Sequence, residues 1–157
     1  MNNSKTYLTN DGLYKLKQEL DDLTNNQRPQ LAKRLREAIK MGDLKENADY
    51  IAAKEDQAFI EGRILEIQDM ISSSIIIDPK TNTQEVSIGS QVTIKENNKS
   101  DNTENYTLVG SAEADPTAGL ISHESPIGQA LIGKSIGDTV EVNTPGGALS
   151  FKIIKIQ

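Results

Sequence analysis

The run Met41-Gly42-Asp43-Leu44-Lys45-Glu46-Asn47-Ala48-Asp49-Tyr50 separates two long segments with helical periodicity. Gly42 stands where the first pattern stops, and glycine commonly follows a helix because it accepts a positive φ. Asp43 can cap a second helix, with Glu46 three residues later in capping-box register. We therefore expect a helical hairpin with a very tight tip at residues 42–47, where both carboxylates are exposed.

The two carboxylates at this tip have two interpretations. Acidic groups near a helix N-terminus offset the macrodipole, each by ~0.3–1 kcal/mol, and capping alone would account for Asp43 and Glu46. Alternatively they are half of a hard-metal site, since Mg²⁺ is commonly held by one or two carboxylates plus water and substrate phosphates. Such a tip would bind the ion weakly by itself and would need another macromolecule to complete the coordination.

Apolar residues on both sides of the tip recur at helical spacing. Thr9 is a good N-cap for the first helix. Its apolar stripe, with the spacing of a coiled-coil seam, is Leu13, Leu16, Leu20, Leu23, Leu31, Leu35 and Ala38. Pro29 should kink this helix or shift its phase, and the helix should continue to about Met41. The facing stripe of the returning helix is Ile60, Ile64, Ile67 and Ile71, with Ala48, Ala52, Ala53 and Ala58 nearer the tip.

Three cations near the tip share one helix face. Lys33, Arg36 and Lys40 are three and then four residues apart. With Glu37 as an i,i+4 partner of Lys33, they can form an ordinary solvated face. Beside an acidic tip, they would also suit a rod lying along an RNA phosphate backbone.

After Ser72-Ser73-Ser74 the period changes from 3.6 to 2, beginning with Ile75-Ile76-Ile77. A turn-rich linker at residues 78–82 is followed by strand-like runs at 91–95, 105–109, 139–142 and 149–156, with a polar loop at 96–104 between the first two. One helix interrupts the strands; Ser125 is its N-cap, Pro126 its first residue, and it ends near Gly133.

These patterns predict an α+β protein with two domains. Residues 1–77 should form a long antiparallel helical hairpin, or coiled coil, with the acidic tip at 42–47. Residues 78–157 should form an antiparallel β-sheet with one helix packed on it.

Composition excludes several classes of function. The 157-residue chain has no cysteine, so disulfides and thiolate chemistry are absent. Its formal net charge of −6 argues against a general nucleic-acid binder. The only histidine, His123, has no triad partners and is expected in a loop or at a strand end. No signal-like segment or long apolar run is present, so we expect a cytoplasmic monomer with no membrane contact.

The sequence resembles the bacterial Gre-type transcript-cleavage factors over essentially its whole length. The N-terminal likeness lies in the tip run at 42–50, continued by Ala52-Ala53-Lys54-Glu55 and Glu61-Gly62-Arg63-Ile64. The C-terminal likeness lies in Ser125-Pro126-Ile127-Gly128, Leu131-Ile132-Gly133-Lys134 and Thr144-Pro145-Gly146-Gly147.

The resemblance implies a transcription elongation factor without an active site of its own. Its C-terminal domain would be FKBP-like and would dock at the secondary channel of bacterial RNA polymerase, while the coiled coil enters the channel. Asp43 and Glu46 would help hold a Mg²⁺ shared with polymerase, near the 3′ end of backtracked RNA, and would stimulate the polymerase's own RNA cleavage. The family's docking loop corresponds to Glu124, Ser125 and Pro126, although aspartate or asparagine also occurs at the first position. The modest basic patch suggests a preference for short backtracks.

Two other functions remain as alternatives. A channel-binding inhibitor could use the same scaffold and differ mainly at the tip, where the Asp43/Glu46 pair favours cleavage. A peptidyl-prolyl isomerase is suggested by the implied C-terminal fold. That chemistry needs an aromatic-lined pocket, and beyond residue 77 the chain offers only Tyr106 and Phe151.

Overall fold

The computed structural model describes residues 5–78, 84–97 and 102–157. Most of the predicted linker at 78–82 and the middle of the predicted loop at 96–104 lie outside these residues. The chain forms two compact units: Leu13–Ser73, and Ser74–Gln157 together with the residues up to Gly12. The predicted domain boundary after residue 77 stays a prediction. Among the described helices, none is long and apolar enough to cross a membrane.

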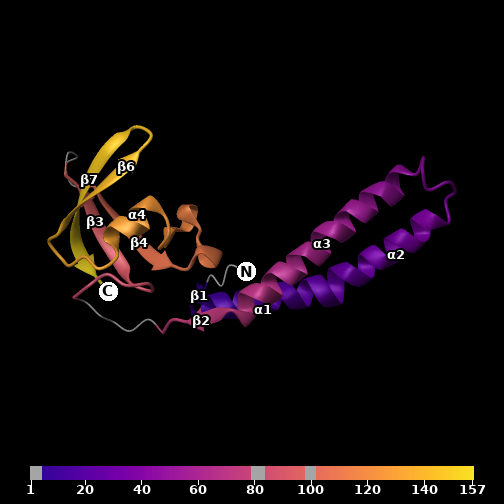
Figure 1. The fold of residues 1–157 in the computed structure, drawn as a ribbon, viewed down its shortest axis with the longest axis horizontal. Coiled ribbons are helices and arrows are strands. Elements are labelled where there is room, and N and C mark those ends of the chain that lie inside the picture. The colour runs from indigo at the N-terminus through magenta and orange to yellow at the C-terminus, as the bar shows by residue number, and fades with distance from the viewer. Residues whose placement is uncertain (1–4, 79–83, 98–101) are drawn as a thin grey trace. The chain divides into compact units, whose positions relative to one another are not determined.

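The first unit is helical, and its two arms are antiparallel. The first arm consists of α1 (Asn10–Asp22), a π-helical turn η1 (Leu23–Gln27) and α2 (Arg28–Ile39). The second is α3 (Ala48–Ser72), which lies beside α2 (Figure 1) and is ~38 Å long at 1.5 Å per residue. The predicted N-cap Thr9 is confirmed, since its hydroxyl oxygen accepts a hydrogen bond from the Gly12 amide at 3.0 Å.

A one-residue irregularity in the first arm is absorbed by the π turn. The buried residues Leu16, Leu23, Leu31 and Ala38 are separated by seven, eight and seven residues. An α-helix turns ~100° per residue, so an eight-residue step would rotate the next side chain ~80° away from the seam. In η1 the Arg28 amide donates to the Leu23 carbonyl, five residues back, which takes up the extra residue.

Pro29 explains where this turn is placed. Proline has no amide hydrogen, and its ring clashes with the carbonyl four residues earlier in a regular α-helix. Pro29 instead lies in the first turn of α2, directly after η1. The predicted phase shift at Pro29 is therefore confirmed, and the apolar stripe stays on one face across it.

The facing surface of α3 agrees with the predicted stripe in its central part. Ile60, Ile64 and Ile67 are buried. Of the four alanines expected to face α2 near the tip, Ala53 is fully buried, whereas Ala48 and Ala58 are exposed and do not face it. This expectation was wrong for those two because each lies five residues from Ala53, which places it ~140° around the helix from the buried face.

Arginines join the two arms along their exposed edges. Arg28 makes a bidentate ion pair with Glu61, with a shortest N–O distance of 2.6 Å. Arg63 makes a bidentate ion pair with Glu19, with a shortest N–O distance of 2.7 Å. The hydrogen bond to Glu19 is the largest cause of a raised pKa for Arg63. Exposed pairs add little stability because water and salt screen them. Their geometry, however, fixes which residues of the two arms lie opposite one another.

The second unit contains a five-stranded sheet in the order β5-β4-β3-β7-β6. Its strands are β3 (Gln91–Glu96), β4 (Thr103–Val109), β5 (Leu120–Ser122), β6 (Thr139–Thr144) and β7 (Gly147–Ile156). The sheet and the helix α4 (Pro126–Leu131) enclose an apolar core. This core includes Val92, Ile94, Leu108, Leu131, Val140, Phe151 and Ile153.

The expected combination of helix and sheet is confirmed, but the sheet is not wholly antiparallel. β5 pairs with β4 in parallel, with Thr107 opposite Leu120. The sequence did not predict β5, which has only three residues and follows two short 3₁₀ turns at Ser111–Glu113 and Pro116–Ala118. Across these turns the chain returns from the end of β4 to the level of Thr107 and then runs forward again, so β5 has the same direction as β4.

Another small sheet was also missed. β1 (Thr6–Leu8) pairs in parallel with β2 (Ser74–Ile76), outside the five-stranded sheet. The second unit includes β1 for two reasons. A side chain on Gly110 would place its Cβ 1.8 Å from the Tyr7 carbonyl oxygen, so the two backbones touch. The Glu113 carboxylate also accepts hydrogen bonds from the Thr9 amide and hydroxyl, at 2.7 Å and 2.6 Å.

The link between Pro29 and the π turn can be tested by deletion. Removing Asn25 should restore seven-residue spacing but place the proline inside a continuous α-helix, at a cost of about 3 kcal/mol or more. Combining the deletion with Pro29→Ala should recover most of this loss. Pro29→Ala alone should change stability little, because the extra residue still needs the π turn. Urea unfolding followed by helical circular dichroism measures the four free energies; a neutral single deletion would contradict the explanation.

Candidate functional site

The connection between α2 and α3 is longer than the sequence suggested. Residues 40–47 lie between the helices, and Gly42 has a φ of 129°, as expected for the glycine after a helix. The N-cap of α3 is Asn47, whose side-chain oxygen accepts from the Tyr50 amide at 3.1 Å. The predicted cap at Asp43 with a capping box to Glu46 was therefore wrong, because Asp43 lies too far ahead of the helix.

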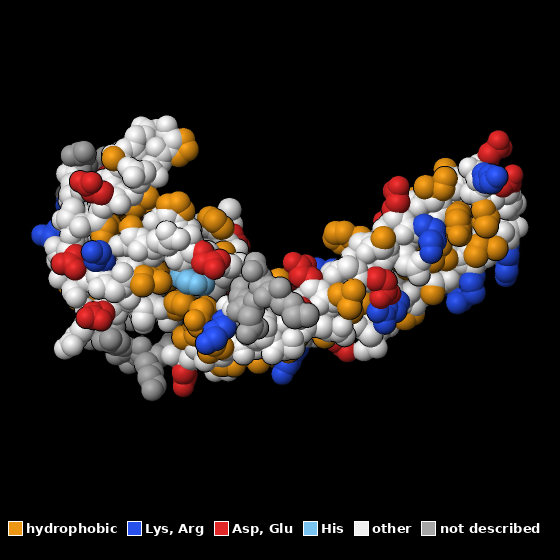
Figure 2. Space-filling view, in the orientation of Figure 1, with side chains coloured by type: hydrophobic (Ala, Val, Ile, Leu, Met, Phe, Trp, Pro, Cys, Tyr) orange, Lys and Arg blue, Asp and Glu red, His pale blue; other side chains and the backbone are white. Residues whose placement is uncertain are grey.

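Asp43 and Glu46 nevertheless come together at the tip. Both are exposed, and both line one open hollow with Met41, Asn47 and Ala48. Figure 2 shows acidic side chains at this end of the helical hairpin. The Asp43 Oδ1 atom accepts from the Lys45 amide at 3.0 Å. Within the described residues, Oδ2 of Asp43 and both carboxylate oxygens of Glu46 have no hydrogen-bond or ion-pair partner.

These oxygens suit a hard cation that also has ligands from elsewhere. Carboxylates are favoured ligands of Mg²⁺, which usually keeps several waters and binds only one or two protein carboxylates. In residues 5–78, 84–97 and 102–157, no cluster of three or more acidic or histidine side chains is arranged to hold a metal. The donor set at the tip therefore fits a Mg²⁺ held partly by this chain.

Sequence reasoning missed the role of Asn47. Its side-chain amide donates to the Ala38 carbonyl oxygen at 2.7 Å, across the neck of the hairpin. One side chain therefore starts α3 and ties it to the end of α2. An asparagine immediately before a helical run is itself an N-cap signal, so its capping role could have been predicted. The contact with Ala38 could not, because it depends on how the two helices pack.

Arg34 makes a second connection near the tip. Its guanidinium donates to Asp49 Oδ1, with a shortest distance of 2.6 Å, and to Asp56 Oδ2 at 2.8 Å. The hydrogen bond to Asp49 is the largest cause of a raised pKa for Arg34. Asp49 lies in the first turn of α3, so this cation neutralises an acid close to the tip while leaving Asp43 and Glu46 unpaired.

The predicted basic face is present on α2 and just beyond its end. Lys33, Arg36 and Lys40 are all exposed. Lys33 lies 3.9 Å from Glu37, the i,i+4 partner expected for a solvated face. Arg36 and Lys40 form no ion pair with any residue that the structure describes, so both are available to an external anion.

The predicted docking loop precedes α4. Ser125 is confirmed as the N-cap, since its hydroxyl oxygen accepts from the Gly128 amide at 3.0 Å, and Pro126 begins the helix. Glu124 is exposed, and its carboxylate accepts a short hydrogen bond from the Ser111 hydroxyl. The Glu124 carbonyl accepts from the Gln129 side chain at 3.1 Å, which further fixes the loop.

Ser122 organises this loop, and sequence reasoning did not identify it. Its hydroxyl oxygen accepts from the Glu124 amide at 3.1 Å and lies 3.0 Å from the Ser111 hydroxyl. Its carbonyl accepts from the Ser125 hydroxyl at 2.7 Å. Ser122 ends β5, a strand that the sequence pattern did not reveal, so no signal marked it.

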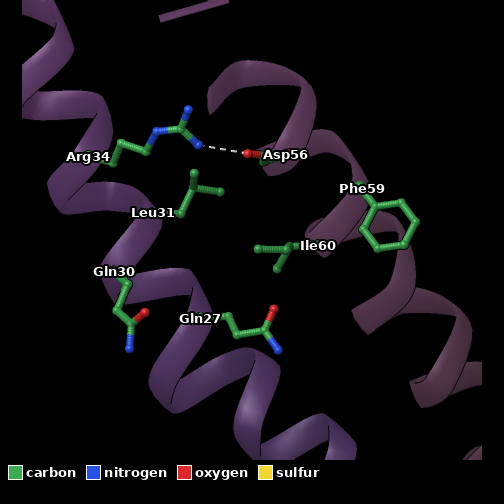
Figure 3. A pocket seen from close by; sticks show the side chains of 7 residues that line it. All are labelled: Gln27, Gln30, Leu31, Arg34, Asp56, Phe59 and Ile60. Atoms are coloured by element: carbon green, nitrogen blue, oxygen red, sulfur yellow. Dashed lines mark hydrogen bonds and ion pairs between the residues drawn. The ribbon is translucent and has the colours of Figure 1, made fainter. Parts of the chain in front are cut away.

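One groove on the hairpin lies away from the acidic tip. In Figure 3, Leu31 and Ile60 point toward one another between α2 and α3, with the Arg34–Asp56 ion pair beside them. Phe59 is 73% exposed beside this groove. The full lining is Gln27, Gln30, Leu31, Arg34, Asp56, Phe59 and Ile60. Arg34 and Asp56 pair with one another, and the other polar side chains of the groove are the uncharged amides of two glutamines. The groove therefore has apolar surface for packing but no free charged group suited to catalysis or metal binding.

Known proteins resemble the chain along its whole length. Residues 6–76 match the family description "Transcription elongation factor, N-terminal", and residues 80–157 match "Transcription elongation factor, GreA/GreB, C-term". Transcription elongation factor GreA of Acetivibrio thermocellus is 45% identical over 156 residues, covering 99% of this chain and 98% of that protein. GreA of Leuconostoc mesenteroides is 48% identical over 159 residues, covering 99% of each.

A solved structure also matches. GreA factor homolog 1 (Gfh1) of Thermus thermophilus is 29% identical and covers 98% of this chain and 99% of that one, with a TM-score of 0.45. The two family matches together span nearly all of the sequence, and the GreA relatives match it end to end. The chain therefore belongs to the GreA/GreB family of transcription elongation factors.

Proposed function

We propose that this protein enters the secondary channel of bacterial RNA polymerase and stimulates the polymerase's own cleavage of backtracked RNA. The observation that carries the proposal is the pair of exposed, unpaired carboxylates at the end of an antiparallel helical hairpin. Family membership supplies the context. The hairpin acts as a coiled coil that reaches into the channel, and an FKBP-like C-terminal domain docks at the channel rim. The protein restores elongation by arrested complexes without being an enzyme itself.

In this proposal, Asp43 and Glu46 supply oxygen ligands that complete a site shared with polymerase. A Mg²⁺ bound there would stabilise the incoming and leaving oxygens of phosphodiester hydrolysis, as in two-metal catalysis. The contribution of this chain is to present the carboxylates in a fixed arrangement. Asp43 is held through its Oδ1 atom by the Lys45 amide, which leaves Oδ2 available as a ligand.

The exposed cations just behind the tip serve a different purpose. Lys33, Arg36 and Lys40 lie on or next to α2 and can attract the phosphate backbone of extruded RNA. Because Lys33 also has Glu37 beside it, Arg36 and Lys40 carry most of the available positive charge. A small basic face suits a short length of RNA, and we expect preference for short backtracks.

The docking surface is the loop of Glu124, Ser125 and Pro126. Several backbone and side-chain hydrogen bonds hold this loop before it meets any partner. A loop ordered in advance loses little conformational freedom on binding, which favours affinity. The exposed Glu124 and Pro126 provide the contact, and Ser125 fixes its shape.

The two alternatives make different demands on these residues. An inhibitor on the same scaffold needs the hairpin but not a pair of available carboxylates, so the tip favours cleavage. A peptidyl-prolyl isomerase needs aromatic side chains that line a pocket. Phe151 is only 6% exposed and packs in the apolar core, and the Tyr106 hydroxyl donates to Glu104 at 2.5 Å. Neither ring is free to form such a pocket.

The tip chemistry is tested by removing charge without changing size. Asp43→Asn and Glu46→Gln should each abolish stimulated cleavage and leave polymerase binding nearly unchanged, because the docking surface is untouched. The assay uses a stalled, backtracked polymerase complex with 3′-labelled RNA, together with a separate binding titration. Lys54→Gln, an exposed change on α3, is the control. If either tip variant stimulates cleavage at the wild-type rate, the proposed role of that carboxylate as a metal ligand is wrong.

The docking role is tested in the loop before α4. Replacing Glu124 and Pro126 with alanine, while keeping Ser125 and its cap, should weaken polymerase binding. Raising the concentration of the factor should then recover full cleavage, since the tip is intact. Ile136→Ala, at another exposed apolar position in the same unit, is the matched control. A binding curve that superimposes on wild type would remove this loop from the interface.

The reach of the hairpin is tested by a matched deletion. Removing residues 16–22 and 60–66 takes seven residues from each arm, centred on the Glu19–Arg63 pair, and preserves the seam. The tip would withdraw by ~10 Å. Coordination distances tolerate only about 0.2 Å, so cleavage should vanish. The shortened protein should remain helical and compete with wild type for polymerase. If it stimulates cleavage normally, the carboxylates at the tip do not take part in the cleavage reaction.

A further inference from the structure

Asn47 holds the tip through two hydrogen bonds in opposite directions. Its side-chain oxygen accepts from the Tyr50 amide at 3.1 Å, and its side-chain nitrogen donates to the Ala38 carbonyl at 2.7 Å. Its side chain is half-buried, whereas residues 41–46 are all exposed. Asn47 is therefore the one residue between Met41 and the start of α3 that is anchored to the rest of the hairpin.

The anchor point on α2 is itself fixed. Ala38 is 1% exposed and is the last buried residue of the α2 seam. Its carbonyl also accepts from the Met41 amide at 3.1 Å, which starts the loop. The bond from Asn47 to the same carbonyl closes the loop at its other end. Both ends of the segment that carries Asp43 and Glu46 thus meet at one backbone oxygen.

We propose that Asn47 is a positioning residue for the tip carboxylates. This inference rests on the proposed function and deepens it. By joining the start of α3 to Ala38, Asn47 sets the span of the loop and so the placement of Asp43 and Glu46. Groups that support metal ligands in this way typically change metal affinity or activity by 10–100-fold when they are removed.

Neither an aspartate nor a serine can make both of the hydrogen bonds that Asn47 makes. A carboxylate has the accepting oxygen needed for the cap, but it cannot donate and would face the Ala38 carbonyl with a second negative oxygen. A serine hydroxyl can also cap a helix. It is shorter than the asparagine side chain and has one hydrogen, so it cannot both cap the helix and span the neck.

Two substitutions separate the cap from the bond to Ala38. Asn47→Ser and Asn47→Asp both keep a good N-cap residue and lose the donor to Ala38. With each, we expect stimulated cleavage at saturating factor to fall about 10–100-fold, with the half-saturating factor concentration unchanged. Asn47→Asp also adds a negative charge next to the tip, which by itself would strengthen cation binding. A loss of cleavage in this variant therefore reports position rather than charge.

A measurement on the free protein reads the placement of Asp43 directly. The Lys45 amide donates to Asp43 Oδ1, so its hydrogen exchange reports whether that turn is formed. Exchange at Lys45 should become faster in both Asn47 variants, while the Tyr50 amide stays protected by the new cap. The control is Glu61→Gln, which weakens the cross-hairpin pair with Arg28 far from the tip. It should change neither Lys45 exchange nor cleavage.

The outcomes distinguish this inference from the proposed function. Suppose that Asn47→Ser and Asn47→Asp stimulate cleavage like wild type while Asp43→Asn is inactive. Asn47 then has no positioning role, and the proposed role of the tip carboxylates is retained. If Asp43→Asn itself cleaves normally, the proposed chemistry is wrong whatever Asn47 does. Unchanged Lys45 exchange in both variants would also overturn the inference. Should Asn47→Ser lose helical content, Asn47→Asp decides the result, because its charge also stabilises the N-terminus of α3.

Discussion

Everything at the tip depends on a continuous apolar seam between the two arms of the hairpin. The seam requires Leu16, Leu23, Leu31 and Ala38 to face α3, although their spacing is irregular by one residue. The π turn at Leu23–Gln27 corrects the phase, and Pro29 follows it in a position that lacks the usual helical clash. Without this correction, Leu31 and Ala38 would rotate away from α3, and Ala38 could not receive the Asn47 bond.

The tip separates the residues that build the structure from those available for chemistry. Asn47 and Arg34 make the contacts that hold the start of α3. Asp43 and Glu46 take no part in capping and remain exposed, so their charges are not neutralised by the fold. An exposed carboxylate keeps its hydration until a cation replaces it, and its presence costs the core nothing. This division suits a factor that completes a site in another molecule.

The loop before α4 follows the same logic in the other unit. Ser122 ends a short strand and holds Ser111, Glu124 and Ser125 through its hydroxyl and carbonyl oxygens. Gly128 allows α4 to approach closely, since a Cβ there would lie 2.1 Å from the Ser122 carbonyl oxygen. Both surfaces are therefore exposed turns whose shape is set by hydrogen bonds from neighbouring elements, which is typical of functional loops on a rigid scaffold.

The sequence by itself determined the helical arms, four of the five strands of the main sheet, the caps at Thr9 and Ser125, and the exposure of Asp43 and Glu46. These features follow from periodicity and local capping, which act over a few residues. Only the tertiary structure decided that Asn47 binds the Ala38 carbonyl, that β1 and β5 pair in parallel, and that Ser122 holds the loop before α4. Each of these depends on partners distant in sequence, such as Ala38 for Asn47 and Ser74–Ile76 for β1, which no local pattern specifies.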